Sequence, residues 1–360
     1  MLLTNNFALP IEDVASVVID VGGSWEKLRD KSLLLTGGTG FIGKWLIETL
    51  IHANQEYGLN CNLTVPSRNP NSFLEKYPGV LQYPYVNIVF SDLSHDKTSI
   101  LDIYDFVIHG ATDVILKEKP KKYFQNILRS TQCVIDASSR ADVDCKFLLL
   151  SSGAVYGPAP PGEHYFREGD NFSTHVNKVQ QAYAEGKRFS EILCALEADT
   201  NARFHYNIAR CFSFVGPYLP LTEQFAIGNF INDVLNNREI CVKGDGTTLR
   251  SYQYVSDLCT QLWKILLEGK PGEVFNVGSD QVVSIKQLAN NIISALKAPI
   301  GMRMLGIPES GSLPQSYLPN IEKVTGTFNY QNKVNLRQSI IKTSKWYLSR
   351  QEGLINNEFN

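Results

Sequence analysis

Short apolar runs alternate with amphipathic stretches along the chain up to Cys211. Apolar runs bounded by Gly, Pro, Asn or Asp predict buried strands, whereas apolar residues spaced three and four apart predict helices. Strands are predicted on this basis at Leu33–Thr36, Asn62–Pro66, Val86–Phe90, Asp105–His109, Cys145–Ser151 and Phe204–Cys211. Helical spacing is found between them at Phe41–Ala53, Lys121–Ser138 and Val176–Glu197. The alternation predicts an α/β fold, with crossover connections and a doubly wound parallel sheet covered by helices on both faces.

After Cys211 the pattern is less regular and richer in Gly and Pro. Elements are expected there at Phe225–Asn236, Glu239–Val242, Ser256–Leu267, Ser284–Leu296 and Val334–Leu348. We expect residues 31–211 to form the sheet domain, with residues 251–275 returning to it. Residues 212–250 and 276–360 are expected to form a smaller mixed α/β domain that binds the substrate.

Residues 1–30 precede this alternation and contain one amphipathic stretch, Ile11–Val21, so we expect them to form an N-terminal extension. The first residues lack a basic stretch followed by an apolar core, and a secretory signal is not expected. No apolar run approaches the ~18–20 residues that a membrane helix needs, so no membrane partner is expected.

The composition narrows the class of protein further. The chain has 360 residues, 43% hydrophobic and 19% charged, which suits a buried core and argues against intrinsic disorder. Lys and Arg total 34 against 36 Asp and Glu, so the chain lacks the basic field that binding to nucleic acid requires. Seven scattered cysteines without a CxxC pair indicate reduced thiols in a cytoplasmic protein. The six histidines form no close pair, and a metal site is not expected.

The first predicted strand leads directly into the segment Thr36–Gly43 (TGGTGFIG), which is followed by a helix. Glycines in such a loop allow a tight turn, a close approach of backbone amides to a pyrophosphate, and close packing of helix on sheet. The helix N-terminus adds partial positive charge. An ordinary turn could use the same glycines, but strand, loop and helix in this order predict a Rossmann-type dinucleotide site. The residues expected in it are Gly37, Thr39, Gly40, Phe41, Ile42 and Gly43.

The end of the second predicted strand bears on the choice of cofactor. An acidic residue there binds the ribose of NAD, whereas Arg accommodates the 2′-phosphate of NADP. The segment Val65–Asn69 (VPSRN) contains no carboxylate, and Ser67 and Arg68 are expected near the phosphate. NADP(H) is therefore favoured and NAD(H) stays possible, because Arg68 could instead stack on the adenine without discriminating.

Two further strand ends are candidates for cofactor contacts. Asp92 and Leu93 follow the third predicted strand, where a carboxylate could accept a hydrogen bond from the adenine amino group. The alternative is that Asp92 caps the next segment. His109 and Ala111 lie at the end of the fourth strand, where small residues would leave room for the diphosphate and ribose. A plain turn is the alternative there.

Tyr183 and Lys187 lie four residues apart, on one face of a predicted helix. A phenol with an ordinary pKa of ~10 transfers protons poorly at neutral pH, and a nearby ammonium stabilises its phenolate form. Ser152 follows the fifth predicted strand and could donate to the same substrate oxygen. A solvated helix face would explain Tyr183 and Lys187 alone. With the glycine loop upstream and Ser152 between, the three residues predict proton transfer coupled to hydride transfer at a nicotinamide, with Lys187 also contacting the cofactor.

Four segments together resemble the extended short-chain dehydrogenase/reductase family, in its nucleotide-sugar epimerase/dehydratase/reductase branch: Thr36–Gly43, Ser151–Gly157, Tyr183–Lys187 and Ala209–Tyr218. The resemblance covers about residues 32–350. It implies a cytoplasmic enzyme with bound NAD(P) that acts on a sugar linked to a nucleoside diphosphate. It also implies a homodimer in which two long helices per subunit form a four-helix bundle, here Lys121–Ser138 and Val176–Glu197.

The resemblance further implies substrate-binding residues in the second half of the chain. Arg250 lies where the family places an arginine on the substrate diphosphate, and a planar guanidinium suits that task. Asn229 resembles a residue whose amide meets the same diphosphate, and Tyr317 lies in a segment that resembles a C-terminal family motif. Ser213 stands where the family often has Asn, so this sugar contact departs from the pattern. Asp257 is expected to cap a helix.

The two residues after Ser152 bear on the reaction. By resemblance, dehydratases place Asp-Glu there, decarboxylases of UDP-glucuronate place Glu second, and 3,5-epimerase/reductases place Cys. Here they are Gly153 and Ala154, which cannot transfer protons. A reaction that needs only a hydride and one proton remains: 4-keto reduction, 4-epimerisation or C4 oxidation.

We expect a reductase of a nucleotide-linked 4-keto-6-deoxy sugar, feeding surface polysaccharide assembly by analogy with the family. The alternatives are a nucleotide-sugar 4-epimerase with retained NAD and, from another class, a non-catalytic NADP(H)-binding sensor. His164 and His175, in the polar segment 158–177, could assist proton transfer, although a solvated loop is the simpler interpretation.

Overall fold

We analysed a computed structural model of the chain. It describes residues 9–95, 100, 102–112, 119–139, 143–172, 179–223, 225–307, 311 and 313–358, without the side chains of residues 180 and 351–358. The chain divides into two compact units. Unit 1 comprises Met1–Gly157, Ser173–Cys211 and Cys259–Phe275, and unit 2 comprises Pro158–Phe172, Phe212–Leu258 and Asn276–Asn360.

Unit 1 is built on a seven-stranded sheet. Across the sheet the strands are β12 (Val274–Val277), β7 (Phe204–Cys211), β5 (Cys145–Ser152), β4 (Phe106–His109), β1 (Ser32–Thr36), β2 (Asn62–Ser67) and β3 (Val86–Phe90). The strands from β7 to β3 pair in parallel. β1 is followed along the chain by β2 on one side, while β4 pairs with its other side, so the winding direction reverses between β1 and β4. Ligands of such sheets bind at the carboxyl edge of this reversal.

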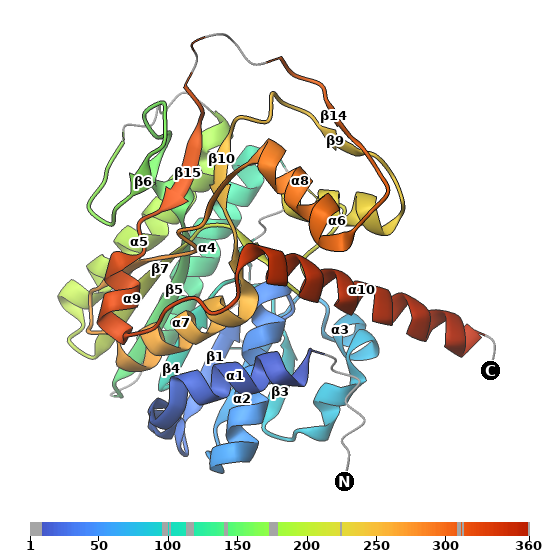
Figure 1. Ribbon diagram of the computed structural model, residues 1–360. Coiled ribbons are helices and arrows are strands. Elements are labelled where there is room, and N and C mark those ends of the chain that lie inside the picture. The colour runs from blue at the N-terminus through green and yellow to red at the C-terminus, as the bar shows by residue number, and fades with distance from the viewer. Residues whose placement is uncertain are drawn as a thin grey trace. The chain divides into compact units, whose positions relative to one another are not determined.

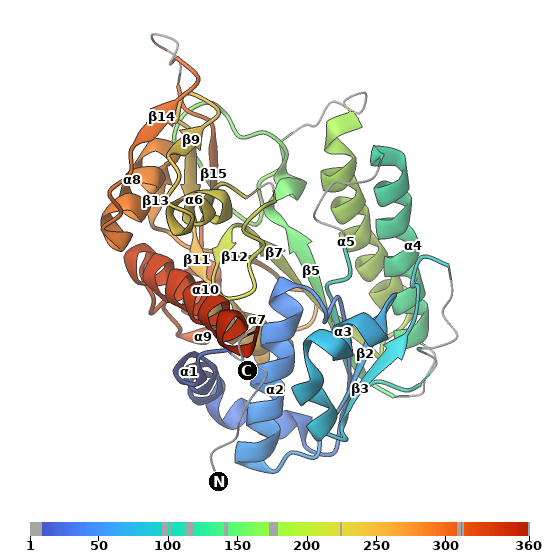
Figure 2. The same cartoon turned by 90° about the vertical axis from the view of Figure 1, so that its right-hand side faces the viewer.

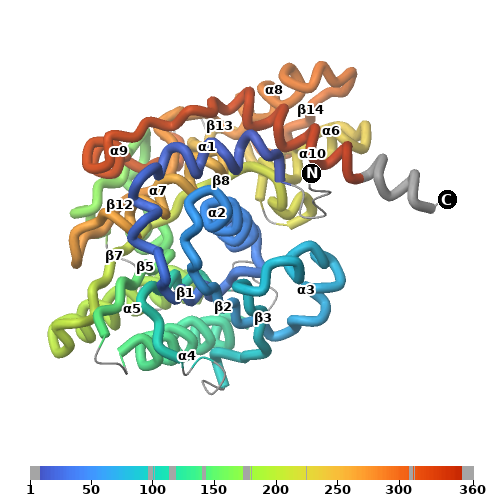
Figure 3. The backbone as a smooth tube through the Cα atoms, turned by 90° about the horizontal axis from the view of Figure 1, so that it is seen from below, coloured from blue at the N-terminus to red at the C-terminus, as the bar shows by residue number. Residues whose placement is uncertain are grey.

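Helices cover both faces of this sheet, as the alternating pattern predicted. The helices of unit 1 are α1 (Ile11–Val21), α2 (Phe41–Tyr57), α3 (Pro70–Lys76), α4 (Pro120–Ser138), α5 (Ala182–Thr200) and most of α7 (Val255–Glu268). α4 and α5 run side by side on one face, and α2 lies on the other with α1 packed against it (Figures 2 and 3). The predicted α/β fold with a doubly wound parallel sheet is confirmed. The sequence did not predict α3 or the seventh strand, β12.

The segment before β1 is part of this unit. α1 is followed by a 3₁₀ helix, η1 (Gly22–Leu28), that carries the fully buried Trp25. The Trp25 ring packs 4.9 Å from that of Trp263, on the helix α7 (Val255–Glu268). The Trp263 indole donates to Thr49 Oγ1 on α2 at 2.9 Å. These buried aromatic rings hold the N-terminal segment against α2.

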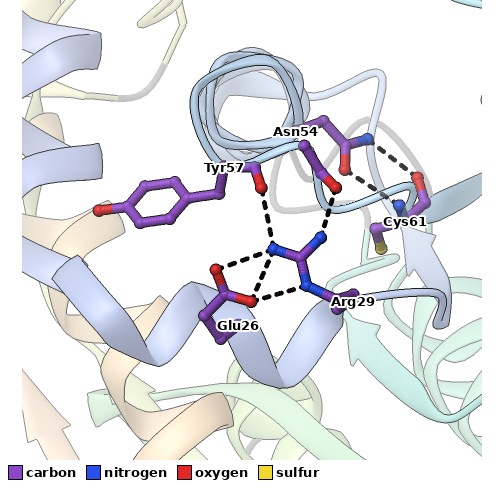
Figure 4. Close-up of polar contacts among 6 residues, drawn as sticks. Glu26, Arg29, Asn54, Tyr57 and Cys61 are labelled. Atoms are coloured by element: carbon purple, nitrogen blue, oxygen red, sulfur yellow. Dashed lines mark hydrogen bonds and ion pairs between the residues drawn. The ribbon is translucent and has the colours of Figure 1, made fainter.

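Figure 4 shows how the far end of α2 is tied to the start of the sheet. The helix ends at Gly58, which has a left-handed φ of 57°. Arg29 donates to the carbonyl oxygens of Tyr57 and Gly58 at 2.9 and 2.7 Å, and its guanidinium pairs with Glu26. These bonds satisfy carbonyl groups that a helix C-terminus leaves open. The neighbouring Asn54 side chain bonds the N–H and C=O of Cys61, one residue before β2.

Unit 2 contains a four-stranded sheet, which Figure 1 shows with α6 and α8. In order its strands are β13 (Val282–Ser284), β10 (Leu249–Ser251), β15 (Ser316–Pro319) and β6 (Tyr165–Phe166). Two strand pairs accompany it: β8 (Phe214–Val215) with β11 (Gln253–Tyr254), and β9 (Ile240–Val242) with β14 (Met302–Met304). Its helices are α6 (Ala226–Leu235), α8 (Ile285–Leu296), α9 (Glu322–Phe328) and α10 (Leu336–Glu358).

The segment Pro158–Phe172 differs from the loop expected between the serine and tyrosine motifs. Its strand β6 pairs in parallel with β15. The Asn276 side chain donates to the Phe166 carbonyl at 2.8 Å, and the Asn276 N–H donates to Glu168 Oε1 at 2.9 Å. These contacts make the segment an edge of the unit 2 sheet. No local pattern predicts this, because a two-residue strand has too short a period to recognise.

Three chemical features bear on function. All seven cysteines carry free thiols, and six of them are buried. Among the described residues, no group of three or more His, Cys, Asp or Glu side chains is arranged to hold a metal ion. No helix in the described part of the chain combines the length and apolar character needed to cross a membrane.

Candidate active site

The loop between β1 and α2 and the first turn of α2 are packed so tightly that three of their residues must be glycine. Gly37 has a φ of 75°, and a Cβ there would lie 2.7 Å from the Gly110 carbonyl group. A Cβ on Gly43 would lie 2.3 Å from the Gly37 carbonyl oxygen, and one on Gly38 would lie 2.5 Å from Val65 Cγ1. Any side chain at these positions would push the loop away from its neighbours. At Gly43 the first turn of α2 therefore packs directly against the backbone of the loop.

The same loop presents the start of α2. The helix begins at Phe41 with Gly40 as its N-cap, and glycine has no side chain to accept from the first N–H groups. These open N–H groups and the helix dipole form a positive site for a phosphate. Thr39 is half-buried and Gly40 exposed beside them. The loop has no room for side chains at its glycines, and its helix start has open N–H groups. Both features suit the binding of the pyrophosphate of a dinucleotide.

The end of β2 presents Arg68 at the surface. Ser67 is buried, and its Oγ accepts from the Asn69 N–H at 3.2 Å. Asn69 caps α3 by accepting from the Ser72 N–H. Arg68, between them, is exposed in the turn. The predicted cofactor-discriminating residues thus lie at the carboxyl edge of the sheet, one strand from the glycine loop.

The end of β3 places Asp92 in a turn. Its carboxylate accepts from the Ser94 hydroxyl at 2.6 Å and the Ser94 N–H at 3.1 Å, and lies 3.1 Å from His95 Nδ1. The Ser94 hydrogen bonds come first among the causes that lower the Asp92 pKa. Leu93 is buried. The Asp92 carboxylate therefore already has local donors in this turn, and its contact with an adenine stays a prediction.

His109, at the end of β4, is fully buried. Its Nδ1 lies 2.8 Å from Thr36 Oγ1, and its Nε2 lies 3.2 Å from Thr131 Oγ1 on α4. Burial lowers the pKa of His109 to about 3, so the imidazole is neutral at physiological pH. Because its side chain is committed to internal bonds, His109 can take part in the predicted cofactor site only through its backbone. Ala111, two residues on, is half-buried.

Lys187, on α5, reaches the end of the central strand β5. Its Nζ donates to the Leu150 carbonyl oxygen at 2.8 Å, two residues before Ser152, and to Thr112 Oγ1 at 2.7 Å. Ser152 ends β5 and caps the 3₁₀ turn η4 (Gly153–Tyr156), where its Oγ accepts from the Ala154 N–H. Tyr183 lies one turn before Lys187, in the first turn of α5, and is half-buried. The structure thus brings the helix of Tyr183 and Lys187 to the strand that carries Ser152.

Burial dominates the electrostatics of Lys187. Its side chain is 3% exposed, and removal from water lowers the pKa of its ammonium to about 8. Glu191, one turn further along α5, acts in the opposite direction. The ammonium therefore remains largely charged at neutral pH, where it can stabilise a phenolate.

In unit 2, Arg250 lies beside a group of aromatic rings. It pairs with Tyr317 across β10 and β15, and its guanidinium lies 5.4 Å from the Tyr317 ring. That ring packs 4.7 Å from Phe212. Arg250 Nη1 donates to the Leu249 carbonyl oxygen, and burial lowers its pKa. Among the described residues, no carboxylate lies within ion-pair distance of Arg250, so its charge is open to an anionic ligand.

Comparison with known proteins agrees with this arrangement. Residues 33–278 match the model of the NAD dependent epimerase/dehydratase family. The chain belongs to this family. UDP-glucuronic acid decarboxylase 1 of Arabidopsis thaliana is 28% identical over 328 residues, which cover 89% of this chain and 70% of that protein. The family match confirms the predicted resemblance to extended short-chain dehydrogenases/reductases, and with it an NAD(P)-binding enzyme of the nucleotide-sugar epimerase/dehydratase type.

Solved structures of epimerases share the family fold. An epimerase from Methanothermobacter thermautotrophicus matches with a TM-score of 0.76 at 20% identity, over 93% of this chain and 97% of that one. The UDP-glucose 4-epimerase of Thermotoga maritima, solved with UDP-glucose, matches with a TM-score of 0.73 at 19% identity, over 89% and 99%. At these identities the comparison establishes the Rossmann-type fold.

The other predicted site residues of this family member lie in unit 2. Asn229 is half-buried on α6, and Ser213 lies just before β8, where its carbonyl accepts from the Gln253 N–H. Asp257 is buried and accepts from the Tyr330 hydroxyl at 2.6 Å and from two backbone N–H groups. His164 lies 3.3 Å from Asp170, and its ring packs edge-on against Phe166 and Phe172. His175 lies outside the described residues.

Sequence reasoning missed a buried ion pair beneath Lys187. Glu191 pairs with Arg210 of β7 at 2.7 Å and accepts from the Ser151 hydroxyl at 2.5 Å. Arg210 also lies over the Tyr156 ring, and the Glu191 carboxylate raises its pKa despite burial. The sequence does indicate Glu191, because it continues the four-residue spacing of Tyr183 and Lys187 and so lies on the same face of the helix. The pair ties α5 to β5 and β7.

Proposed function

We propose that the protein is an NADPH-dependent reductase of a nucleoside-diphosphate-linked 4-keto sugar, in particular a 4-keto-6-deoxy sugar. The observation that carries the proposal is the position of Lys187, bonded to the end of β5 from the helix that bears Tyr183. The two residues after Ser152, Gly153 and Ala154, have no group that can transfer a proton. The candidate site therefore supports one proton transfer together with a hydride transfer.

In this proposal each residue has one task. The nicotinamide of a cofactor whose pyrophosphate binds at the glycine loop would supply the hydride. Tyr183 donates its phenolic proton to the carbonyl oxygen of the sugar, which becomes a hydroxyl group. Lys187 stabilises the phenolate that remains until solvent reprotonates it. Ser152 donates a hydrogen bond to the same oxygen and orients the carbonyl group.

The preference for NADP(H) rests on the end of β2. No carboxylate is present in the segment 65–69 to accept from a ribose 2′-hydroxyl, and Arg68 is exposed there. A guanidinium suits a 2′-phosphate because it can form two parallel charge-assisted hydrogen bonds. A reductase, which consumes reduced cofactor at each turnover, is consistent with that choice.

For the substrate, we propose that unit 2 binds the nucleoside diphosphate. The half-buried Arg250, with its charge open to an anion, would bind the diphosphate, and the adjacent rings of Tyr317 and Phe212 offer flat apolar surface. Asn229 on α6 and Ser213 beside β8 are the further proposed contacts. The Thermotoga maritima relative was solved with a ligand of this class, UDP-glucose.

Relatives in this family carry out other reactions that bear on the proposal. The curated relatives include UDP-glucuronic acid decarboxylases. By resemblance to the family, such decarboxylases have Glu at the second position after the serine, where this chain has Ala154. A 4-epimerase needs the same Ser152, Tyr183 and Lys187, and the structural neighbours include 4-epimerases. It would retain NAD and require no added reductant. Epimerisation is therefore the second candidate.

We also propose a cytoplasmic homodimer that uses α4 and α5. Phe189, Ile192 and Leu196 of α5 are 42%, 49% and 60% exposed, and their spacing of three and four places them on one helix face. An apolar stripe of this kind suits a four-helix bundle with a second copy. The seven free thiols suit a reducing compartment, and the family analogy suggests a role in surface polysaccharide assembly. Leu196→Glu should convert a dimer to a monomer in sedimentation analysis; a monomeric wild type would contradict the proposal.

The decisive experiment follows loss of NADPH absorbance with a panel of 4-keto-6-deoxy nucleotide sugars, with products identified by NMR. Tyr183→Phe should remove nearly all turnover while cofactor binding is retained. Tyr57→Phe is the matched control, because Tyr57 lies at the opposite end of α2 from the glycine loop. It should leave turnover unchanged.

The outcomes separate the candidates. NADPH consumption with a reduced sugar product supports the reductase. Interconversion of C4 epimers without added cofactor supports the epimerase. A protein that binds NADPH but turns over nothing in the panel would support the sensor, and full activity of Tyr183→Phe would refute the assigned mechanism.

A further inference from the structure

The backbone that follows β4 is held rigidly in unit 1. Thr36 Oγ1 accepts from the N–H groups of Gly110 and Ala111, each at 3.2 Å. Since its lone pairs face these N–H groups, the Thr36 hydroxyl donates to His109 Nδ1, and the imidazole carries its proton on Nε2, toward Thr131. The backbone after β4 is thereby bonded to β1, and the His109 side chain to α4.

Thr112 is the next residue of this segment, and its hydroxyl oxygen lies 2.7 Å from Lys187 Nζ. The Leu150 carbonyl oxygen provides a second acceptor at 2.8 Å. Lys187 is almost fully buried, so each N–H of its ammonium that lacked an acceptor would cost free energy. A hydroxyl on a rigid backbone directs the ammonium with little loss of side-chain freedom.

We propose that Thr112 is a positioning residue that fixes the direction of the Lys187 ammonium and keeps it charged. Its relevance to turnover rests on the proposed function, whereas its effect on the charge of Lys187 does not. The Thr112 hydroxyl acts as acceptor toward the ammonium and has its own proton free to donate elsewhere. A hydrogen bond to the charged form stabilises that form.

The other charged and titratable groups around Lys187 are either paired or neutral, so they do not replace Thr112 as an acceptor for its ammonium. Glu191, on the same helix, is paired with Arg210. Cys211, on β7, is a neutral thiol because burial raises its pKa to about 12. His109, on β4, is neutral because burial lowers its pKa to about 3. The acceptors of the Lys187 ammonium are therefore the Thr112 hydroxyl and the Leu150 carbonyl oxygen. Glu191, by contrast, is already paired with a second cation, Arg210.

The test compares three variants: Thr112→Ser keeps the hydroxyl, Thr112→Val removes it at equal size, and Thr112→Ala removes it with a smaller side chain. Urea unfolding followed by tryptophan fluorescence is measured from pH 6 to pH 10. Loss of a hydrogen bond to a charged group should lower the pKa of Lys187 by about one to two units. The stability deficit of Thr112→Val relative to Thr112→Ser should be largest near pH 6 and shrink toward pH 9. The basic limb of the kcat/KM profile should move to lower pH by the same amount.

The controls make the outcome decisive. In a Lys187→Met background, Thr112→Val and Thr112→Ser should show a difference that is constant with pH. A constant difference in the Lys187 background as well would overturn the proposal and leave Thr112 with a packing role only. If Thr112→Val does not fold, Thr112→Ala takes its place in the same comparison. Because the unfolding data need no substrate, the Thr112 result stands even if no keto sugar is turned over.

Discussion

The buried pair of Glu191 and Arg210 provides a sharp test of how the helix of Tyr183 is held. Their side chains are 9% and 14% exposed, and they meet at 2.7 Å. The change Glu191→Gln removes the negative charge but keeps the size of the side chain. It leaves the Arg210 guanidinium buried without its carboxylate and weakens the bond from Ser151. Its effect should therefore be far larger than that of a surface ion pair.

The expected magnitude follows from burial. Removal of one partner from a buried ion pair costs about 3–5 kcal/mol, because the other charge is left uncompensated. Replacement of both partners by apolar residues of similar size is often close to neutral. We therefore expect Glu191→Gln to cost about 3 kcal/mol, and the double variant Glu191→Leu with Arg210→Met to cost less than either single change.

The assay is urea unfolding followed by tryptophan fluorescence. Three of the four tryptophans, Trp25, Trp45 and Trp263, belong to unit 1, so the signal follows the unit that contains the pair. The matched control is the ion pair of Arg29 and Glu26 in Figure 4, whose side chains are 43% and 50% exposed. Glu26→Gln should cost ~1 kcal/mol or less. The reasoning is wrong if Glu191→Gln costs no more than Glu26→Gln, or if the costs of the two single changes simply add in the double variant.

Four further changes test other parts of the site, and a fifth, Gly326→Ala, is a control on a helix outside it. Burial lowers the pKa of Lys187 from its ordinary 10.5 to about 8 in the folded protein, so the cost of burying its charge disappears as pH rises between these values. The stability of wild type relative to Lys187→Met should therefore rise by roughly 3 kcal/mol over this interval. A difference that stays flat with pH would contradict the burial argument. Gly43→Ala should cost about 1–3 kcal/mol in unfolding and abolish cofactor binding measured by calorimetry, because its Cβ would lie 2.3 Å from a carbonyl oxygen. Gly326→Ala, on α9 with nothing within 4 Å, should instead stabilise by about 1 kcal/mol. Arg68→Glu should shift the ratio of kcat/KM from NADPH toward NADH, and an unchanged ratio would remove the cofactor argument. Arg250→Lys should raise KM for the nucleotide sugar about tenfold or more while cofactor affinity is unchanged, since a point charge cannot bind bidentately.

Much of the fold followed from local patterns. The buried strands of a parallel sheet are continuous apolar runs, and the helices that connect them show a period near 3.6 residues. The predicted strands Val86–Phe90 and Phe204–Cys211 match the structure at both ends. By contrast β12, a run of four residues, and β6, a run of two, become strands through distant partners. Their burial and pairing arise from chain segments that a local window does not contain.

For the candidate site, the sequence by itself determined the parts that one short segment can form. The glycine loop with its helix, and the four-residue spacing of Tyr183 and Lys187, are set by backbone geometry over a few residues. Only the tertiary structure decided which partners these residues have. It placed Thr112 on Lys187, buried His109 between Thr36 and Thr131, and joined Glu191 to Arg210. The partners in these pairs are 19 to 75 residues apart in sequence, so packing of the sheet against α4 and α5 brings them together, and no local periodicity records that packing.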